Sequence, residues 1–472
     1  MLVKELRQGL RARGFVGAFI GFQVLMAIVM MVGAAQSMLG SAQARALAFN
    51  TANGFFWTLI TVQLLLFTPG RALGSLQLEV TTRTVDLLLL TRLNAWRIVT
   101  GKWVSLMVQA VLLLVSILPY GIVRYFAGSV DLVGDARQCA ALLGGAGLLT
   151  AAGLWGAGLG KVIRILGVVV GVFIFGGARG AITAFTSGGL GFAGIRWAPG
   201  AQSLVWFDGA LLIAFFLVAA VRNIAPPAEN HTLLARALPL AALLPVPVGA
   251  ILSGPSVAMT AQLMFAGFFL LLVCMTQLAS YDLPMSVHFR SARRRAAGLR
   301  VFLRMTLPGW PSALLYTLSG ALLWLLGSAL LRIPGGPGID LARASWLAML
   351  MLTGLIFPCV VMAIAPQKAR AGAGVYMATF VTAGALAPLA YALVSMSSKI
   401  ATLKTVVAVL PVSSAIFALV EPDAVSAGQV VAQGVVGLVV IGAAWWQARF
   451  YWQHLTGLEL RERREATAVT AG

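Results

Sequence analysis

Residues 14–35 read GFVGAFIGFQVLMAIVMMVGAA, an apolar run without a single charged side chain. About 20 such residues in a helix cross the roughly 30 Å hydrocarbon core of a bilayer, because each residue adds about 1.5 Å. The run is also longer than the hydrophobic region of about 7–15 residues in a cleaved signal peptide. We therefore predict that it is a retained first membrane span.

The rest of the chain repeats this pattern. Of its 472 residues, 60% are hydrophobic and only 10% are charged, and the mean hydropathy is +0.93; soluble domains carry about 25% charged residues. Long continuous runs favour helices over the alternating strands of a barrel. We predict an all-α, polytopic transmembrane helical bundle of about twelve spans: 14–36, 54–70, 103–124, 138–160, 163–181, 205–221, 237–253, 258–280, 311–332, 343–365, 371–395 and 428–447.

The strongly basic balance predicts the orientation of the chain. A net charge of +20 would suggest nucleic acid binding in a soluble protein. Here the Lys and Arg residues concentrate in alternate loops, which is the distribution of cytoplasmic loops in membrane proteins. We expect both termini in the cytoplasm and the chain in a plasma membrane, the bacterial inner membrane. The basic excess also predicts contact with anionic lipid headgroups.

The spans divide into two groups of six. The first half, 1–236, and the second, 237–472, join where Ala225-Pro226-Pro227 interrupts any helix. In each half the longest cytoplasmic loop follows the second span, at 71–102 and at 281–310. Duplicated halves are common in transporters, and chance similarity is the alternative.

One apolar stretch is not counted as a span. Residues 403–420 are apolar enough to cross, but Pro411 and Ser413-Ser414 interrupt them. A thirteenth span would place the basic C-terminal tail outside. We predict a re-entrant or surface helix at the outer face.

The N-terminus has an amphipathic pattern. Leu2, Leu6 and Leu10 recur at every fourth residue, and the other face carries Lys4, Arg7, Arg11 and Arg13. This spacing predicts a helix lying on the membrane surface. A basic flank that only sets topology is the alternative.

The sequence contains no motif in which residues suited to catalysis or metal binding lie at the required spacing. The histidines and cysteines are widely spaced: His231, His288, His454, Cys139, Cys274 and Cys359. Gly160-Lys161 is not a phosphate-binding loop, because Trp155 and Val162 stand where glycine and Ser or Thr are required. We predict no catalytic, cofactor or metal site on this chain, and no enzyme activity.

The most informative segment is the first long loop. Its residues in order are Glu79, Thr84, Asp86, Leu87 to Leu90, Thr91, Leu93, Gly101 and Lys102. An acidic residue begins this short amphipathic stretch, and basic residues end it. Such a helix between two spans could dock into a groove of a cytoplasmic partner.

This order resembles the signature of type-2 ATP-binding-cassette (ABC) exporter permeases. That signature has an acidic residue, Gly-Thr-Leu-Glu, a leucine run, Thr-Pro-Leu, and Gly-Lys entering the third span. Arg83 and Arg92 replace the usual glycine and proline. The N-terminal Lys4-Glu5-Leu6-Arg7 is similar to the family's surface helix. The resemblance covers residues 1–236, and the second half fits by topology alone.

The resemblance implies the permease subunit of an exporter, driven by separate ATPase subunits that dock at the cytoplasmic face. Two sets of residues carry over: Glu79, Thr84, Asp86, Thr91, Gly101 and Lys102 for coupling, and Lys4, Glu5, Leu6, Arg7 and Leu10 for the surface helix. Helix capping and topology are the alternative roles of Glu79 and Asp86. Other functions left open are a non-transporting anchor or assembly subunit, an ion-gradient-driven carrier, and an enzyme acting on lipid-linked substrates. No substrate is indicated.

Overall fold

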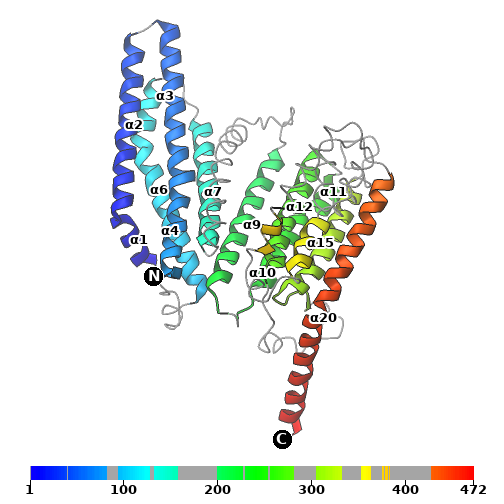
Figure 1. The fold of residues 1–472 in the computed structure, drawn as a ribbon. Helices are drawn as coiled ribbons and strands as arrows, with labels where there is room; N and C mark the ends of the chain where they lie inside the picture. Colours follow the sequence, from blue (N-terminus) through cyan, green and yellow to red (C-terminus); the bar gives the residue numbers. More distant parts are fainter. Residues whose placement is uncertain are drawn as a thin grey trace. The chain divides into compact units, whose positions relative to one another are not determined.

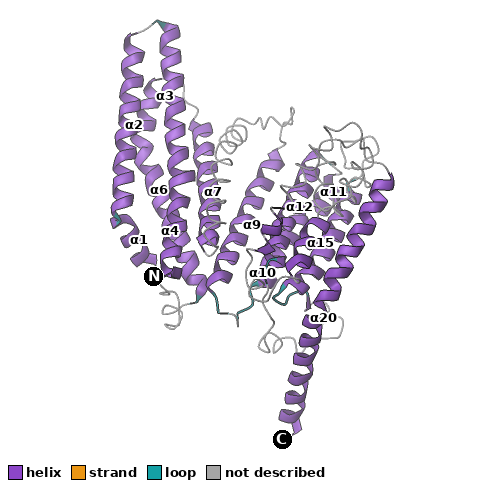
Figure 2. Cartoon of the chain, viewed as in Figure 1, coloured by secondary structure: helices purple, strands orange, loops and turns teal. Residues whose placement is uncertain are grey.

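The computed structural model describes most of the helical framework. The described residues are 2–39, 41–81, 94–127, 132–157, 199–226, 229–253, 256–280, 304–331, 352–362, 375–376, 378–380, 382 and 427–471. Their regular structure is helical, with no strand among them (Figure 2). The predicted all-α class is therefore confirmed for these residues. The chain divides into two compact units, Met1–Ala225 and Pro226–Gly472.

The first unit is a bundle of long helices (Figure 1). Its helices are α1 (Leu2–Arg11), α2 (Arg13–Leu39), α3 (Ala42–Val62), the π-helical turn η1 (Gln63–Phe67), α4 (Thr68–Thr81), α6 (Ala95–Ala127), α7 (Leu132–Ala157) and α9 (Pro199–Ile224). Helices α2 and α3 form an antiparallel pair. Helix α7 packs between α4 and α9.

Two apolar cores hold this unit together. Phe22, Met26 and Ile60 belong to the core formed by α2, α3, α6 and α7. Leu76 and Leu154 belong to the other core, formed by α4, α6, α7 and α9. Burial of such side chains contributes about 1.5–3 kcal/mol each in water, but in a membrane it is close packing that matters.

The π-helical turn joins α3 to α4 without ending the helix. A π-turn displaces the backbone from its regular hydrogen bonding. The backbone N–H of Thr68 donates to the carbonyl of Gln63, and the Thr68 hydroxyl also donates to this oxygen at 3.1 Å. Nearby, Gly153 of α7 lets α4 approach closely, since a Cβ there would lie 3.0 Å from the carbonyl oxygen of Pro69.

The second unit has shorter and more interrupted helices. They are α10 (Thr232–Leu243), α11 (Pro245–Ser253), α12 (Val257–Leu278), α15 (Trp310–Leu330), the helical segment Leu352–Met362, and α20 (Ala427–Ala471). The second half of α20 extends beyond the other described helices of this unit (Figure 1).

Local sequence explains where several of these helices begin. Pro245 separates α11 from α10, because proline cannot donate the backbone hydrogen bond that would continue a helix. The Ser256 hydroxyl caps α12 by accepting from the Met259 N–H at 3.4 Å. Gly309 has a φ of 108°, which favours glycine, and α15 begins directly after it with Trp310-Pro311.

Eight helices in the described residues are long and apolar enough to cross a membrane. They are Arg13–Ala35, Thr51–Leu76, Ala95–Tyr125, Leu132–Ala157, Ser203–Ile224, Thr232–Leu252, Ala258–Leu278 and Trp310–Leu330. They overlap the predicted spans 14–36, 54–70, 103–124, 138–160, 205–221, 237–253, 258–280 and 311–332. The second extends six residues beyond its predicted end, and the third begins eight residues before its predicted start. The chain is therefore a multi-pass membrane protein by the length and composition of its helices.

The remaining spans stay predictions. Residues 163–181 and 403–420 lie outside the described residues, as does almost all of 371–395. The predicted span 343–365 is described only as the short apolar helix Leu352–Met362. The predicted span 428–447 lies within α20, which is helical but is not one of the eight.

Candidate functional site

The N-terminal helix is fixed to the beginning of α6 by an ion pair. Lys102 Nζ lies 3.5 Å from Glu5 Oε1. The Lys102 side chain is 4% exposed and that of Glu5 is 21% exposed, so most of this contact is shielded from solvent. The sequence had assigned Lys102 to coupling and Glu5 to the surface helix. The structure brings these two residues together.

A second contact lies one turn further along α1. The guanidinium of Arg71, on α4, donates to Gln109 Oε1 on α6, and to the carbonyl oxygen of Gly9 at 3.3 Å. It also lies over the Phe15 ring, with 4.8 Å between Cζ and the ring centroid. Gln109 in turn donates to Ser105 Oγ at 3.4 Å. Arg71 therefore links α4 to both α1 and α6.

Gly9 makes this close approach possible. A Cβ at residue 9 would come within 3.0 Å of the Gln109 amide nitrogen. Sequence reasoning missed the role of Gly9 in α1, and it missed Arg71 and Gln109 as partners of this helix. The available signal was the glycine inside a ten-residue amphipathic helix. Glycine there lowers helix stability by about 1 kcal/mol relative to alanine, so its presence indicates a close contact.

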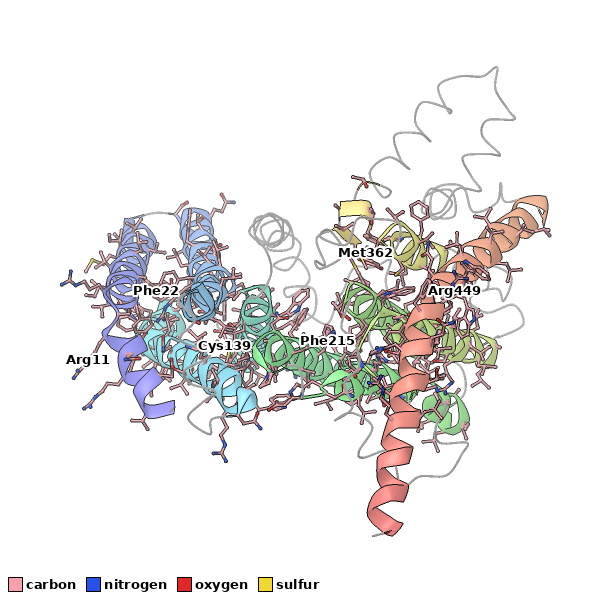
Figure 3. The ribbon with its side chains drawn as sticks, turned by 60° about the horizontal axis from the view of Figure 1, so that its bottom comes forward. Arg11, Phe22, Cys139, Phe215, Met362 and Arg449 are labelled. Atoms are coloured by element: carbon pink, nitrogen blue, oxygen red, sulfur yellow. The ribbon has the colours of Figure 1, made fainter. Side chains whose placement is uncertain are left out.

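The other face of α1 is cationic and open. Arg7 and Arg11 are exposed, as is Arg13 at the start of α2, and Figure 3 labels Arg11 on the side of α1 away from the neighbouring helices. Leu6 and Leu10 are half-buried. We call the contacts of Glu5, Gly9, Arg71, Lys102 and Gln109 the α1 dock.

The predicted coupling loop 71–102 begins within α4 and ends within α6, two of the helices of this dock. Helix α4 ends at Thr81 and α6 begins at Ala95, after Asn94, whose side chain accepts from the Trp96 N–H at 3.2 Å. Glu79 lies in the last turn of α4, and Gly101 in the second turn of α6. The coupling residues Thr84, Asp86 and Thr91 lie outside the described residues, as do the side chains of Glu79 and Lys4.

The second unit contains a different cationic cluster, around Arg236. This side chain, 3% exposed, donates to the Met305 carbonyl, to Ser312 Oγ at 3.3 Å and to Gln277 Oε1 at 3.5 Å. Its guanidinium lies 5.6 Å from the Tyr316 ring centroid, and the Tyr316 hydroxyl donates to the Arg236 carbonyl at 2.8 Å. We call these five residues the Arg236 cluster.

The same region holds the end of the predicted loop 281–310. The Thr306 carbonyl accepts from Thr232 Oγ1 at 2.5 Å and from Asn230 Nδ2 at 3.0 Å. The Pro308 carbonyl accepts from the Tyr451 hydroxyl of α20 at 2.6 Å. Residues 305–308 are therefore tied to α10 and α20 by side-chain hydrogen bonds.

A small cavity lies among the spans of the second unit. Its volume is about 40 Å³, and Leu270, Cys274, Trp324 and Leu355 are among its lining residues. Thr317 also lines it, but its hydroxyl already donates to the Ala313 carbonyl at 2.7 Å. The cavity thus offers apolar contact and little to orient a polar ligand. In the described part of the chain, no three His, Cys, Asp or Glu side chains could hold a metal ion.

These features define the class of the protein, a helical multi-pass membrane protein. No family model, curated protein or solved structure matches the chain. A narrower assignment therefore rests on the residues of the first unit.

Proposed function

We propose that the chain is the membrane-spanning permease subunit of an ABC exporter, energised by a separate ATPase subunit that docks on the loop 71–102. Supporting this is the sequence of residues 79–102 and its place in the fold. The observation that carries the proposal furthest is the α1 dock, which joins both helices flanking that loop.

The dock offers a physical route for coupling. Arg71, on α4, stands at one end of this loop, and Lys102, on α6, stands at the other. Because Glu5 and Gly9 of α1 contact these two cations, a movement of the loop would displace α4, α6 and α1 together. Packed elements with two alternative arrangements are the physical basis of such transmission.

The remaining parts of the proposal concern the partner and the membrane. The carboxylates of Glu79 and Asp86 would pair with basic residues of the ATPase, and ATP hydrolysis would take place on that subunit. Twelve spans with both termini in the cytoplasm of a bacterial cell would place α1 and the loop on the side where an ATPase is available.

Copurification tests this proposal. The tagged full chain is solubilised gently, and bound proteins are identified for the wild type, for the double variant Glu79→Ala/Asp86→Ala, and for Glu229→Ala. Glu229 is the matched control, because it is an acidic residue of the other unit, 40% exposed, whose recorded partner is His231 at 3.0 Å.

An ABC ATPase bound to the wild type and to Glu229→Ala, but lost from the double variant, is the expected result. Equal binding of the ATPase by all three chains would show that the docking site does not depend on Glu79 and Asp86 of the loop. If no ATPase copurifies under conditions that preserve a control complex, the permease proposal fails. Transport that persists without ATP and collapses with the ion gradient would then identify a gradient-driven carrier.

A further inference from the structure

Helix α20 has one continuous exposed face. Its exposed residues recur at intervals of three and four, so they share one side of the helix. They are Val431, Val435, Leu438, Val439, Trp445, Trp446, Arg449 and Phe450. The opposite side is buried within the second unit at Ala444, Ala448, Tyr451 and Leu455.

The exposed face of α20 changes from aliphatic to aromatic side chains along the helix. From Val431 to Leu438 and Val439 it is aliphatic, and at Trp445 and Trp446 it becomes aromatic. From Ala427 to Trp446 the helix rises about 28 Å, close to the thickness of the hydrocarbon core. Tryptophan is enriched where hydrocarbon meets headgroups. The predicted span 428–447 would therefore place Trp446 at the membrane interface.

Arg449 follows Trp446 by three residues on α20 and lies close to two aromatic rings. Its guanidinium carbon is 4.3 Å from the ring centroid of Trp446 and 4.8 Å from that of Phe450. Figure 3 labels Arg449 on α20. Both rings are exposed, each at 66%, so the three side chains stand together on the exposed face of α20.

This arrangement leaves the guanidinium ready for an anion. Stacking on aromatic rings restrains a side chain that otherwise loses about 2 kcal/mol of rotamer freedom when it is fixed. Stacking uses the flat faces of the guanidinium, while its N–H groups point outward in the plane. Among the described residues, no carboxylate or carbonyl is recorded against those N–H groups.

We propose that Trp446, Arg449 and Phe450 form a binding site for the headgroup of an acidic phospholipid. The phosphate accepts from the planar fork of Arg449, which suits two parallel hydrogen bonds. One acyl chain runs along the aliphatic part of the same face, past Leu438 and Val435. The charge of the site selects acidic over zwitterionic lipids, because each cation at a membrane surface favours anionic lipids. The site is independent of the transport function proposed above.

Native mass spectrometry of the purified full chain in detergent tests this site. The chain is titrated with phosphatidylglycerol, or with phosphatidylcholine of the same acyl chains, and the binding constant of the first lipid is measured for each. We expect the wild type to prefer phosphatidylglycerol about fivefold, the ratio given by one cation at the surface.

Three variants separate this site from general charge effects. Arg449→Gln should lose most of the preference for phosphatidylglycerol, and Arg449→Lys should keep part of it. Arg461→Gln removes an exposed arginine of the same helix, further along α20, and should behave as the wild type. The phosphatidylcholine constant checks each variant's fold, since it depends on the apolar face.

Two outcomes would overturn the proposal. One is a wild type that binds both lipids equally. The other is an Arg449→Gln variant that keeps the full preference for phosphatidylglycerol.

Discussion

The α1 dock and the Arg236 cluster both place a cation where a span adjoins a predicted cytoplasmic loop, but they hold it differently. In the α1 dock, Lys102 pairs with Glu5 of a separate ten-residue helix, and Arg71 reaches the backbone of that helix at Gly9. In the Arg236 cluster the recorded acceptors are a backbone carbonyl, a hydroxyl and an amide oxygen.

The two clusters differ in how easily the element that each one holds could detach from its neighbours. Helix α1 has its other face exposed at Arg7 and Arg11, so its attachment depends on the few polar contacts of the dock and on its half-buried leucines. Arg236, by contrast, is buried with Ser312, Tyr316 and Gln277 in the core of its unit. The α1 dock is suited to a part that moves, and the Arg236 cluster to a part that stays fixed.

The largest expected effect is at Arg236. Arg236→Ala leaves Gln277 and the Met305 carbonyl without their donor and opens a gap, and unsatisfied buried polar groups cost about 1–3 kcal/mol each. We expect destabilisation of about 3 kcal/mol, seen as a lower unfolding midpoint by tryptophan fluorescence in detergent. Arg461→Ala, which removes an exposed arginine, should change stability by less than about 0.5 kcal/mol. Equal midpoints for both variants would show that the cluster is not a fixed structural element.

The next effect tests how easily α1 is released. Gly9→Leu should loosen α1, because any side chain at residue 9 displaces the Gln109 amide, which accepts from Arg71. Amide hydrogen exchange in α1 should become at least about tenfold faster, which corresponds to about 1.4 kcal/mol of weaker docking. Gly14→Leu is the matched control, because residue 14 faces open space. Unchanged exchange in Gly9→Leu would mean that α1 is held elsewhere.

A double-mutant cycle measures the ion pair itself. Glu5→Ala and Lys102→Met each remove one partner, and their combined effect on α1 exchange should fall short of the sum by about 1 kcal/mol, since the pair is mostly shielded from solvent. Arg7→Ala, on the exposed face, should show no coupling with Lys102→Met. Additive effects of Glu5→Ala and Lys102→Met would show that the ion pair does not contribute to the docking of α1.

The sequence predicted the helical class and eight spans because those depend on apolar run length, a property of each segment alone. It could not predict that Glu5 meets Lys102, since 97 residues separate them and only packing brings them together. The π-helical turn was missed for a similar reason. Gln63 to Phe67 reads as ordinary apolar helix, and only the hydrogen bond of Thr68 to Gln63 reveals the displaced backbone.

The smallest expected effect tests how residues 305–308, next to the Arg236 cluster, are held in place. Tyr451→Phe removes one hydrogen bond, from the Tyr451 hydroxyl to the Pro308 carbonyl, and should lower stability by about 1 kcal/mol. The cost stays small because Thr232 and Asn230 still hold the neighbouring Thr306 carbonyl. Gln453→Ala, which changes an exposed residue of the same helix, is the control and should leave the unfolding midpoint unchanged. A loss of stability in Tyr451→Phe as large as that in Arg236→Ala would show that residues 305–308 depend on α20 rather than on α10. The second unit would then, like the first, have a helix whose attachment controls its loop.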